Sequence, residues 1–394
     1  MISGFIIVRQ LTVNEYAFYT IANTFLGAMT LLSDCGVNTS VYALGAQNWQ
    51  NKKKMGIILH RGLQLRNHFA IYTLVFTVPV LIYLLYQQHA SNLSIFLIIL
   101  SIIPSFYAGL SDAIFEVVPK LNQELKILQK NQTLVALLRL CLVFLSAFIF
   151  PFTCVILLAN GLPRILGNIK LKKIALKNAE ISNIQDTEVN KETTRIIKRT
   201  APSTIYFVFS SQVSLFILSF LGKTTSIAQL GALGRFSVIF TVFTTFVNMV
   251  FIPRFARSEN NRSLLLKKSH FILLLSLIGS ISVGFVLYIF RSFVLRFLGA
   301  NYQNLDYSFL LIIIQGIITV LSSNAYEFNL RKGWVIHPLL DILISLVPTV
   351  IFAILIPLNT LPNVILYGIL NSLVYFLSHY FAFIVQLFQK ADKY

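Results

Sequence analysis

Residues 271–290 read FILLLSLIGSISVGFVLYIF and contain no charged side chain. A helix rises about 1.5 Å per residue and the hydrocarbon core of a bilayer is about 30 Å thick, so this stretch is long enough to cross a membrane. Similar stretches recur through the 394 residues, of which 56% are hydrophobic and 12% charged, with a mean hydropathy of +0.75. Soluble domains of this length do not have that balance. The sequence therefore predicts an all-α polytopic membrane protein.

Apolar runs bounded by charged or turn residues predict eleven complete spans. These are Tyr16–Ala46, His68–Gln87, Leu93–Val118, Thr133–Phe150, Phe152–Ile169, Pro202–Leu221, Ile227–Pro253, Phe271–Leu298, Leu305–Leu330, Trp334–Ile356 and Leu361–Leu387. The apolar residues Met1–Val8 form only about 12 Å of helix, which is too short to cross. They lack the basic start and small-residue cleavage site of a signal peptide. We interpret them as the end of a truncated first helix, and expect about ten to fifteen further apolar residues to be encoded upstream.

Basic residues are concentrated on one side of the predicted membrane. Most of the 32 Lys and Arg residues lie in the connections 47–66, 119–132, 164–201, 254–270 and 331–332 and in the tail 390–394. Cytoplasmic loops are enriched in Lys and Arg, so this pattern predicts a cytoplasmic carboxyl terminus. The net charge of +18 is explained in this way without a nucleic-acid partner.

An internal repeat predicts two related halves. Glu15–Leu59 aligns without gaps with Ser226–His270 at an offset of 211 residues, and both segments run from an apolar span into a basic loop. The polar stretch between the halves predicts an amino-terminal bundle at 1–169, a cytoplasmic linker at 170–201 and a carboxyl-terminal bundle at 202–394. Two six-helix bundles in a parallel repeat are typical of secondary transporters.

The amino-terminal stretch FIIVRQLTVNEYAFYTIANTFLGAMTLLSDCGVNTSV, residues 5–41, resembles the opening of polysaccharide and O-antigen flippases (Wzx type) of the MATE-like MOP superfamily. The R-x-L-x-x-x-E-Y-x-x-Y pattern falls on Arg9, Leu11, Glu15, Tyr16 and Tyr19. Residues 229–257, QLGALGRFSVIFTVFTTFVNMVFIPRFAR, resemble the matching segment of the second half. The shortened first helix is the departure from the family pattern.

The resemblance implies a flippase that moves an undecaprenyl-pyrophosphate-linked oligosaccharide, an O-antigen or capsule repeat unit, across the inner membrane by alternating access. It implies a lipid-linked oligosaccharide, membrane lipids and other polysaccharide-assembly proteins as partners. A MATE-type drug or cation antiporter shares the architecture and stays open, as does a membrane-embedded polysaccharide polymerase or glycosyltransferase. Such an enzyme normally carries a long outer loop, and none is predicted here.

Charged residues within the spans are the candidate site residues, because charge in a membrane is costly and commonly functional. Arg235, Arg139 and Arg164 are candidate substrate ligands, since guanidinium groups donate paired hydrogen bonds to phosphate. Snorkelling toward the interface is the alternative role. Candidate gating or ion-coupling residues lie in the cytoplasmic third of their helices: Asp34, Asp112, Glu116, Glu327 and Asp341. Pairing with basic loop residues, cation binding and simple interfacial placement all fit them.

Polar stripes at helical spacing favour a hydrated cavity over packing between helices. The stripes are Asn23, Gly27, Thr30, Asp34 and Asn38; Ser101, Ser105, Asp112 and Glu116; Ser203, Ser210 and Ser214; Thr241, Thr245 and Asn248; and Gln315, Thr319, Ser322 and Tyr326. The three cysteines lack metal-ligand spacing, and neither a phosphate-binding glycine loop nor an HExxH motif occurs. The sequence therefore predicts no enzyme activity, no cofactor and no metal.

Overall fold

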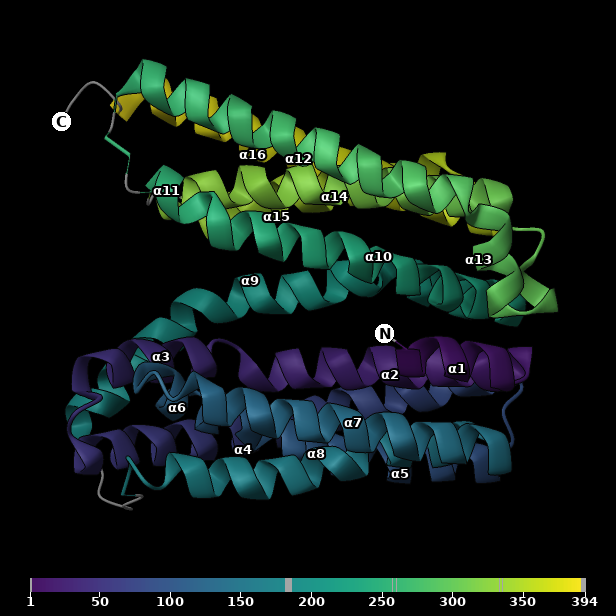
Figure 1. The fold of residues 1–394 in the computed structure, drawn as a ribbon, viewed down its shortest axis with the longest axis horizontal. Coiled ribbons are helices and arrows are strands. Elements are labelled where there is room, and N and C mark those ends of the chain that lie inside the picture. The colour runs from purple at the N-terminus through teal and green to yellow at the C-terminus, as the bar shows by residue number, and fades with distance from the viewer. Residues whose placement is uncertain are drawn as a thin grey trace. The chain divides into compact units, whose positions relative to one another are not determined.

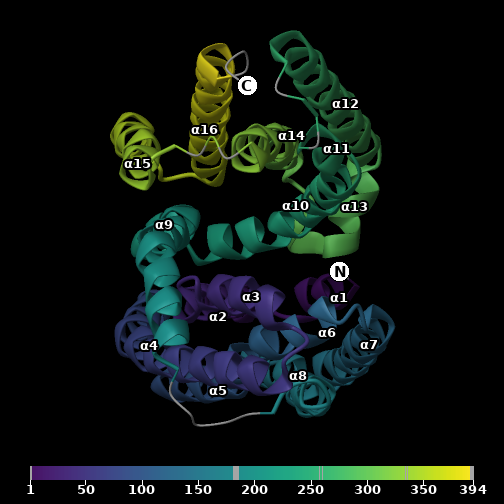
Figure 2. The same ribbon diagram turned by 90° about the vertical axis from the view of Figure 1, so that its left-hand side faces the viewer.

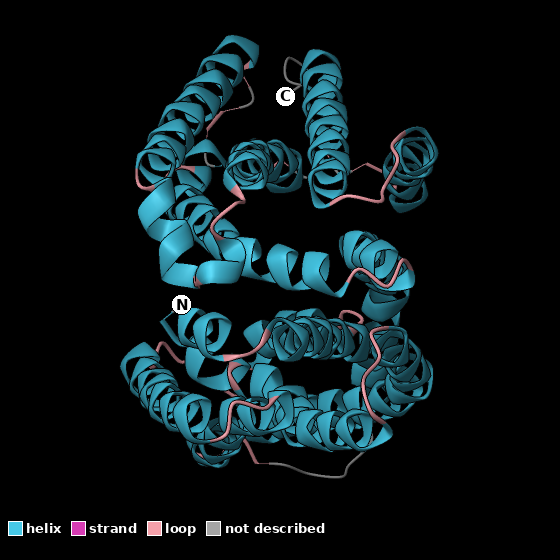
Figure 3. Cartoon of the chain, turned by 90° about the vertical axis from the view of Figure 1, so that its right-hand side faces the viewer, coloured by secondary structure: helices cyan, strands magenta, loops and turns pink. Residues whose placement is uncertain are grey.

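The computed structural model describes residues 2–180, 186–256, 258–259, 261–332, 334 and 336–390, and within them it contains helices and no strand (Figures 1 and 3). The chain forms two compact units, residues 2–227 and 228–394. Within each unit taken by itself, several long helices lie side by side (Figure 2). The predicted all-α fold is confirmed.

The amino-terminal unit is built around α5, which packs against α8, α4 and α2. Its helices are α1 (Ile2–Gln10), α2 (Val13–Asp34), α3 (Val37–Asn48), α4 (Lys52–Gln87), α5 (Asn92–Phe115), α6 (Val117–Leu121), α7 (Leu125–Ile149), α8 (Thr153–Ala175) and α9 (Thr187–Phe220). A Cβ atom at Gly161 of α8 would lie 2.2 Å from Ser105 Oγ of α5, so these two helices approach closely because glycine is present. Ser101 and Ser105 are buried at this side of α5, where they serve packing rather than a hydrated cavity.

The carboxyl-terminal unit is built around α14, which packs against α16 and α12, while α15 packs against α16. Its elements are α10 (Thr224–Val250), α11 (Ile252–Ala256), α12 (Arg262–Ile289), α13 (Arg291–Leu298), the 3-10 turn η1 (Ala300–Tyr302), α14 (Asp306–Arg331), α15 (Pro338–Leu355) and α16 (Leu361–Lys390). Phe255, Phe328 and Phe383 form an aromatic core cluster in this unit. Ser322, a member of one of the predicted polar stripes, donates to the Ser372 carbonyl at 2.9 Å. This serine therefore also contributes to packing between helices.

The two units repeat the same helix order and packing. When α2, α4, α5, α7 and α8 are shifted by 211 residues, their starts fall within about three residues of the starts of α10, α12, α14, α15 and α16. The pairs α5–α8, α4–α5 and α7–α8 correspond to α14–α16, α12–α14 and α15–α16, and all six pairs pack together. The predicted parallel repeat is confirmed by this correspondence.

Helix ends differ from the predicted spans because charged turns continue a helix into water after the apolar stretch has ended. The polar segment 170–201 is largely helical, since α8 runs to Ala175 and α9 begins at Thr187, while residues 181–185 lie outside the described residues. Helix α9 packs against α2, α3 and α4, and the division between the compact units follows Ile227. The sequence analysis assigns residues 187–201 of this helix to the cytoplasmic linker and residues 202–220 to the carboxyl-terminal bundle.

Nine helices within the described residues are long and apolar enough to cross a membrane, whereas eleven spans were predicted. The other two predicted spans correspond to α2, which is interrupted by polar residues, and to α15, whose apolar part Leu339–Leu355 is shorter than the others. The first predicted span breaks between α2 and α3, and the eighth breaks between α12 and α13. The chain is a multi-pass helical membrane protein.

Candidate functional site

The break between α2 and α3 leaves polar backbone groups without a partner of their own helix, inside an apolar helix bundle. Cys35 and Gly36 have φ values of 41° and 89°, the left-handed region that glycine tolerates best. A Cβ atom at Gly36 would lie 1.9 Å from Thr200 Oγ1 of α9, so the side chain of Thr200 fits only against glycine. Asp34 ends α2 and accepts a hydrogen bond from the Asn38 backbone N–H at 3.1 Å. Broken helices persist in membranes where polar groups are satisfied again in this way.

Arg66 of α4 binds the broken end of α2. Its side chain is 2% exposed and its Nη2 atom lies 3.5 Å from Asp34 Oδ1. Nη1 donates to the Leu110 carbonyl at 2.7 Å, and Nη2 donates to the Thr30 carbonyl at 3.4 Å. A buried guanidinium requires such partners, because removing it from water is costly. Arg66 therefore links α2, α4 and α5 at one point.

Sequence analysis missed Arg66, because the charge pattern assigned it to the cytoplasmic loop 47–66. The spacing of apolar residues around Arg66 nevertheless indicates that its side chain is buried. Leu59 and Gly62 lie seven and four residues before Arg66, and Ala70 lies four residues after it. All three are buried. An arginine on the same face as small and apolar residues indicates burial rather than loop exposure.

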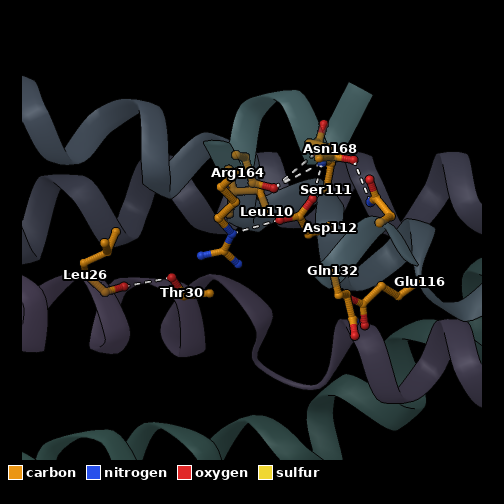
Figure 4. Close-up of polar contacts among 12 residues, drawn as sticks. Leu26, Thr30, Leu110, Ser111, Asp112, Glu116, Gln132, Arg164 and Asn168 are labelled. Carbon is orange, nitrogen blue, oxygen red and sulfur yellow. Dashed lines mark hydrogen bonds and ion pairs between the residues drawn. The ribbon is translucent and has the colours of Figure 1, made fainter. Parts of the chain in front are cut away.

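Asp112 of α5 holds Arg164 of α8, and Figure 4 shows this contact. Arg164 Nε donates to Asp112 Oδ2 at 2.8 Å. Asn168, one helical turn further along α8, donates to Asp112 Oδ1 at 2.6 Å and also lies 2.7 Å from Ser111 Oγ. The two carboxylate oxygens are therefore both occupied, and Oδ2 fixes the guanidinium through its Nε atom.

The terminal nitrogens of Arg164 have no hydrogen-bond partner in the described part of the chain. The side chain is 38% exposed, and Figure 4 shows these nitrogens pointing away from Asp112, on the side of the helix that carries Thr30. A Cβ atom at Gly109 would lie 3.1 Å from Nη2 and 3.3 Å from Nη1, so the guanidinium rests against glycine. The result is a positioned cation with two amino groups able to donate, the arrangement that phosphate oxygens prefer.

Glu116 lies at the junction of α5 and α6 and bonds to two neighbours. Lys120 donates to its Oε2 atom at 2.6 Å and Gln132 of α7 donates to its Oε1 atom at 3.1 Å. Because Lys120 is four residues further along the chain, this pair is of the kind that adds a few tenths of a kcal/mol at a surface. Glu116 thus joins α5, α6 and α7 and follows Asp112 by four residues.

Glu15, which belongs to the amino-terminal pattern behind the family resemblance, connects two helices. Glu15 Oε2 accepts the backbone N–H of Thr153 at 2.7 Å, and Thr153 Oγ1 donates to the Glu15 carbonyl at 2.7 Å. Thr153 is the first residue of α8, whose N–H groups have no partner within the helix. Leu11 and Tyr16 are buried beside it. Glu15 therefore fastens the start of α2 to the start of α8.

The two remaining candidate arginines lie on α7 and α10. Arg139 lies on the exposed surface of α7, where no partner is found within the described residues. Arg235 is half-buried on α10, and so belongs to the carboxyl-terminal unit.

The candidate acids of the carboxyl-terminal unit also have basic partners. Glu327 accepts from Arg331 at 2.8 Å within α14. Asp341 of α15 lies 3.3 Å from His379 of α16. All five acids singled out from the sequence thus pair with a basic residue of the same unit. Four of the partners, Arg66, Lys120, Arg164 and Arg331, belong to the segments assigned to cytoplasmic connections, and they lie in helices. No group of three His, Cys, Asp or Glu residues within the described ranges could hold a metal ion.

Comparisons with known proteins show the fold. No protein-family model and no curated protein matches the chain. An inward-facing multidrug resistance MATE transporter of the MOP superfamily matches with a TM-score of 0.75 at 11% identity, covering 98% of this chain and 94% of its own. An outward-facing structure of such a transporter matches at 0.67 and 15%, covering 100% and 92%. The chain therefore has the same fold as these MATE transporters.

A third match comes from an archaeon. This MOP superfamily transporter from Pyrococcus furiosus has a TM-score of 0.68 at 14% identity, with 98% of this chain and 90% of the other covered. It is described as having a binding pocket of reverse polarity, which suggests a different function. Binding pockets of opposite polarity therefore occur on this fold.

Proposed function

We propose that this protein is an alternating-access flippase that moves an undecaprenyl-pyrophosphate-linked oligosaccharide across the bacterial inner membrane. The fold supports a transporter, and the observation that carries the choice of substrate is Arg164. Its guanidinium is fixed through Nε by Asp112 and keeps two amino groups for a further ligand. A pyrophosphate presents several acceptor oxygens, and an arginine can bind two of them together.

The carboxylates argue against a cationic drug as substrate. A cationic ligand needs a carboxylate that is not already compensated, because burying its charge otherwise costs several kcal/mol. Asp34, Asp112 and Glu116 are each paired with a basic side chain, and Glu15 accepts from Thr153. The amino-terminal unit therefore offers a cationic donor and no uncompensated acid among these candidates, which favours an anionic substrate over the MATE-type antiporter.

The remaining assignments are part of the same proposal. Arg164 is the first phosphate ligand, with Arg235 and Arg139 as further contacts along the path of the substrate. Asp34, Asp112, Glu116, Glu327 and Asp341 act in gating or ion coupling through the pairs described above. The carboxyl terminus is cytoplasmic, and the partners are lipid-linked oligosaccharide, membrane lipids and other polysaccharide-assembly proteins. No metal, no cofactor and no covalent step are required.

The substrate class is tested in liposomes that contain the purified protein. Fluorescently labelled undecaprenyl-pyrophosphate oligosaccharide is placed in both leaflets, and a membrane-impermeant reagent quenches the label outside. We expect the protected fraction to fall when the protein is present and to stay near half in protein-free liposomes. A labelled phosphatidylcholine serves as the lipid control. Ethidium movement without movement of the pyrophosphate lipid would overturn the flippase and favour the drug antiporter.

A further inference from the structure

Asn168 of α8 holds one oxygen of Asp112 with its amide group. Its Nδ2 atom lies 2.6 Å from Asp112 Oδ1, 2.7 Å from Ser111 Oγ and 3.2 Å from the Ala108 carbonyl oxygen. A carboxylate and a carbonyl only accept, so the amino group of the amide, and not its oxygen, must face α5. The Ser111 hydroxyl donates toward the Ala108 carbonyl, so its oxygen accepts from the amide. Asn168 therefore gives its two short hydrogen bonds to Asp112 and Ser111.

Arg164 contacts Asp112 through a single nitrogen. Its Nε atom donates to Oδ2 at 2.8 Å, and the same two atoms define the ion pair. An arginine and a carboxylate commonly pair through two parallel hydrogen bonds, the second of which joins a terminal nitrogen to the other carboxylate oxygen. Here the other oxygen, Oδ1, already accepts from Asn168. The single contact therefore leaves both terminal nitrogens of Arg164 to a further ligand.

Helical spacing and Gly109 fix the plane of the guanidinium. Arg164 and Asn168 are four residues apart on α8, so they share the face that packs against α5, and Figure 4 shows both beside Asp112. A Cβ atom at Gly109 would lie 3.1 Å from Nη2, 3.2 Å from Cζ and 3.3 Å from Nη1. These nearly equal distances mean that the flat face of the guanidinium lies over the glycine. The orientation of the Asp112 carboxylate then decides which guanidinium nitrogens it occupies.

We propose that Asn168 is a positioning residue of the phosphate site, because it holds Oδ1 of Asp112 and thereby keeps both terminal nitrogens of Arg164 available to a phosphate group. This inference rests on the proposed pyrophosphate-lipid substrate. The Asp112 side chain is only 17% exposed, and a buried carboxylate oxygen without a partner is costly. Without the amide, Oδ1 turns to a terminal nitrogen of Arg164, and the substrate has to displace the carboxylate before it binds.

The positioning role is tested first without any substrate. Nitrogen-15 NMR of arginine-labelled protein in nanodiscs reports the hydrogen bonds of each guanidinium nitrogen, and the variant Arg164→Lys identifies the Arg164 signals. In the unaltered protein we expect a carboxylate bond at Nε alone. In Asn168→Leu one terminal nitrogen should also acquire a carboxylate bond, and Asn168→Ala is the second variant where leucine disturbs packing. Unchanged terminal-nitrogen signals in these variants would overturn the proposal.

Binding is measured with inorganic pyrophosphate as the probe. Asn168→Leu should weaken pyrophosphate binding about tenfold, because the ligand then competes with Asp112 for a terminal nitrogen and a hydrogen bond to a charged group changes affinity by roughly that factor. In the Asp112→Asn background the same change should weaken binding by less than about twofold, since an amide has a single oxygen and cannot form the double contact. Equal losses in the two backgrounds would show that Asn168 acts through packing alone.

Asn131 of α7 provides the matched control. Its amide donates to the Gly167 carbonyl of α8 at 3.0 Å, so it also joins a neighbouring helix to α8 beside Asn168, but it makes no bond to Asp112. Asn131→Leu should therefore leave pyrophosphate affinity and the Arg164 signals unchanged. A loss of affinity as large as that of Asn168→Leu would mean that any amide between these helices has the same effect, and the proposal would fail.

Transport distinguishes this proposal from the proposed function. In the liposome assay, Asn168→Leu should raise the mole fraction of pyrophosphate lipid that gives half-maximal movement by about tenfold and retain the maximal rate. A lower maximal rate at an unchanged half-maximal fraction would contradict a positioning role. If the unaltered protein moves no pyrophosphate lipid, the flippase is rejected, whereas the NMR signals and the pyrophosphate affinities still decide the role of Asn168.

Discussion

Asp34 and Arg66 join the broken end of α2 to the middle of α4 through an ion pair of 3.5 Å in which the arginine is almost fully buried. Each side of this pair has a second function, because Asp34 caps α3 and Arg66 holds the carbonyls of Thr30 and Leu110. A helix break in an apolar bundle and a buried cation thus stabilise each other. Removing one partner would leave the other without its compensating charge, which lowers the stability of the protein.

The first prediction concerns Arg66→Met. We expect a loss of stability of about 3–5 kcal/mol, because the change leaves the Asp34 carboxylate and two carbonyls without their donor. The measurement is chemical or thermal unfolding of the purified protein in detergent. The double variant Asp34→Asn with Arg66→Met should be less destabilised than the two single changes would add up to, since neither charge is then left alone. Additive losses would show that the two side chains do not interact.

A second prediction concerns the helix break. Gly36→Ala should lower stability by roughly 1–3 kcal/mol, because alanine is strained at a positive φ and its Cβ atom meets Thr200. Gly27→Ala in the preceding helix α2 is the matched control, since no atom lies within 4 Å of a Cβ atom at Gly27. The same unfolding assay measures both variants. Equal stabilities would contradict the left-handed break at Cys35 and Gly36.

The third prediction tests Arg164 as a phosphate ligand. Arg164→Ala should reduce movement of the pyrophosphate lipid by roughly tenfold or more, and Arg164→Lys should restore part of it, because lysine keeps the charge but not the paired donors. Gly109→Ala, which pushes the guanidinium by a few tenths of an ångström, should give a smaller loss. Transport is compared at equal protein in liposomes. Normal transport by Arg164→Ala would remove this residue from the binding site.

A fourth prediction tests Arg235 as a substrate ligand independently of Arg164. Arg235→Ala should reduce lipid movement more than Arg235→Lys, with both proteins inserted and folded, if a positive charge at this depth contacts the substrate. Matched inactivity of the two variants would indicate a geometric need for the guanidinium instead. Full activity of Arg235→Ala would show that the residue is no substrate ligand.

The fifth prediction concerns topology. Reporter tags inserted in the segment 176–186 or placed after Tyr394 should report the cytoplasm, and a tag at Gly222–Thr225 should report the opposite side, because the basic residues favour that orientation. Protease access in sealed vesicles provides an independent measurement. A tag at 176–186 reported outside would reverse the orientation.

The fold could be predicted from the sequence largely because hydropathy and the repeat act over whole helices. Apolar length marks where a helix can lie in a bilayer, and the offset of 211 residues related the two halves. Helix ends were less predictable. Charged turns such as Lys52–Met55 continue α4 beyond the apolar stretch, since the helix itself satisfies its backbone groups in water and in lipid alike.

The candidate site was only partly predictable. Asp34, Asp112 and Asp341 were found, because acids within apolar spans are rare. Their partners were not, because Arg66 and His379 meet them only through tertiary packing of separate helices. For Ser101 and Ser105, in contrast, the spacing predicted a place beside a hydrated cavity. Ser101 and Ser105 fall on the polar face by spacing, yet both are buried, and Ser105 packs closely against Gly161.

The contact between Glu15 and Thr153 has a mechanical consequence. Separating α2 from α8 at this end would leave a carboxylate, a hydroxyl and a backbone N–H without partners, which is costly in an apolar environment. This end is therefore a pivot, and α2 can move relative to α8 chiefly by swinging about it. The largest displacement then falls at the far end of α2, which carries Asp34 and meets Arg66. A small rotation at Glu15 would thus become a lateral step at the helix break.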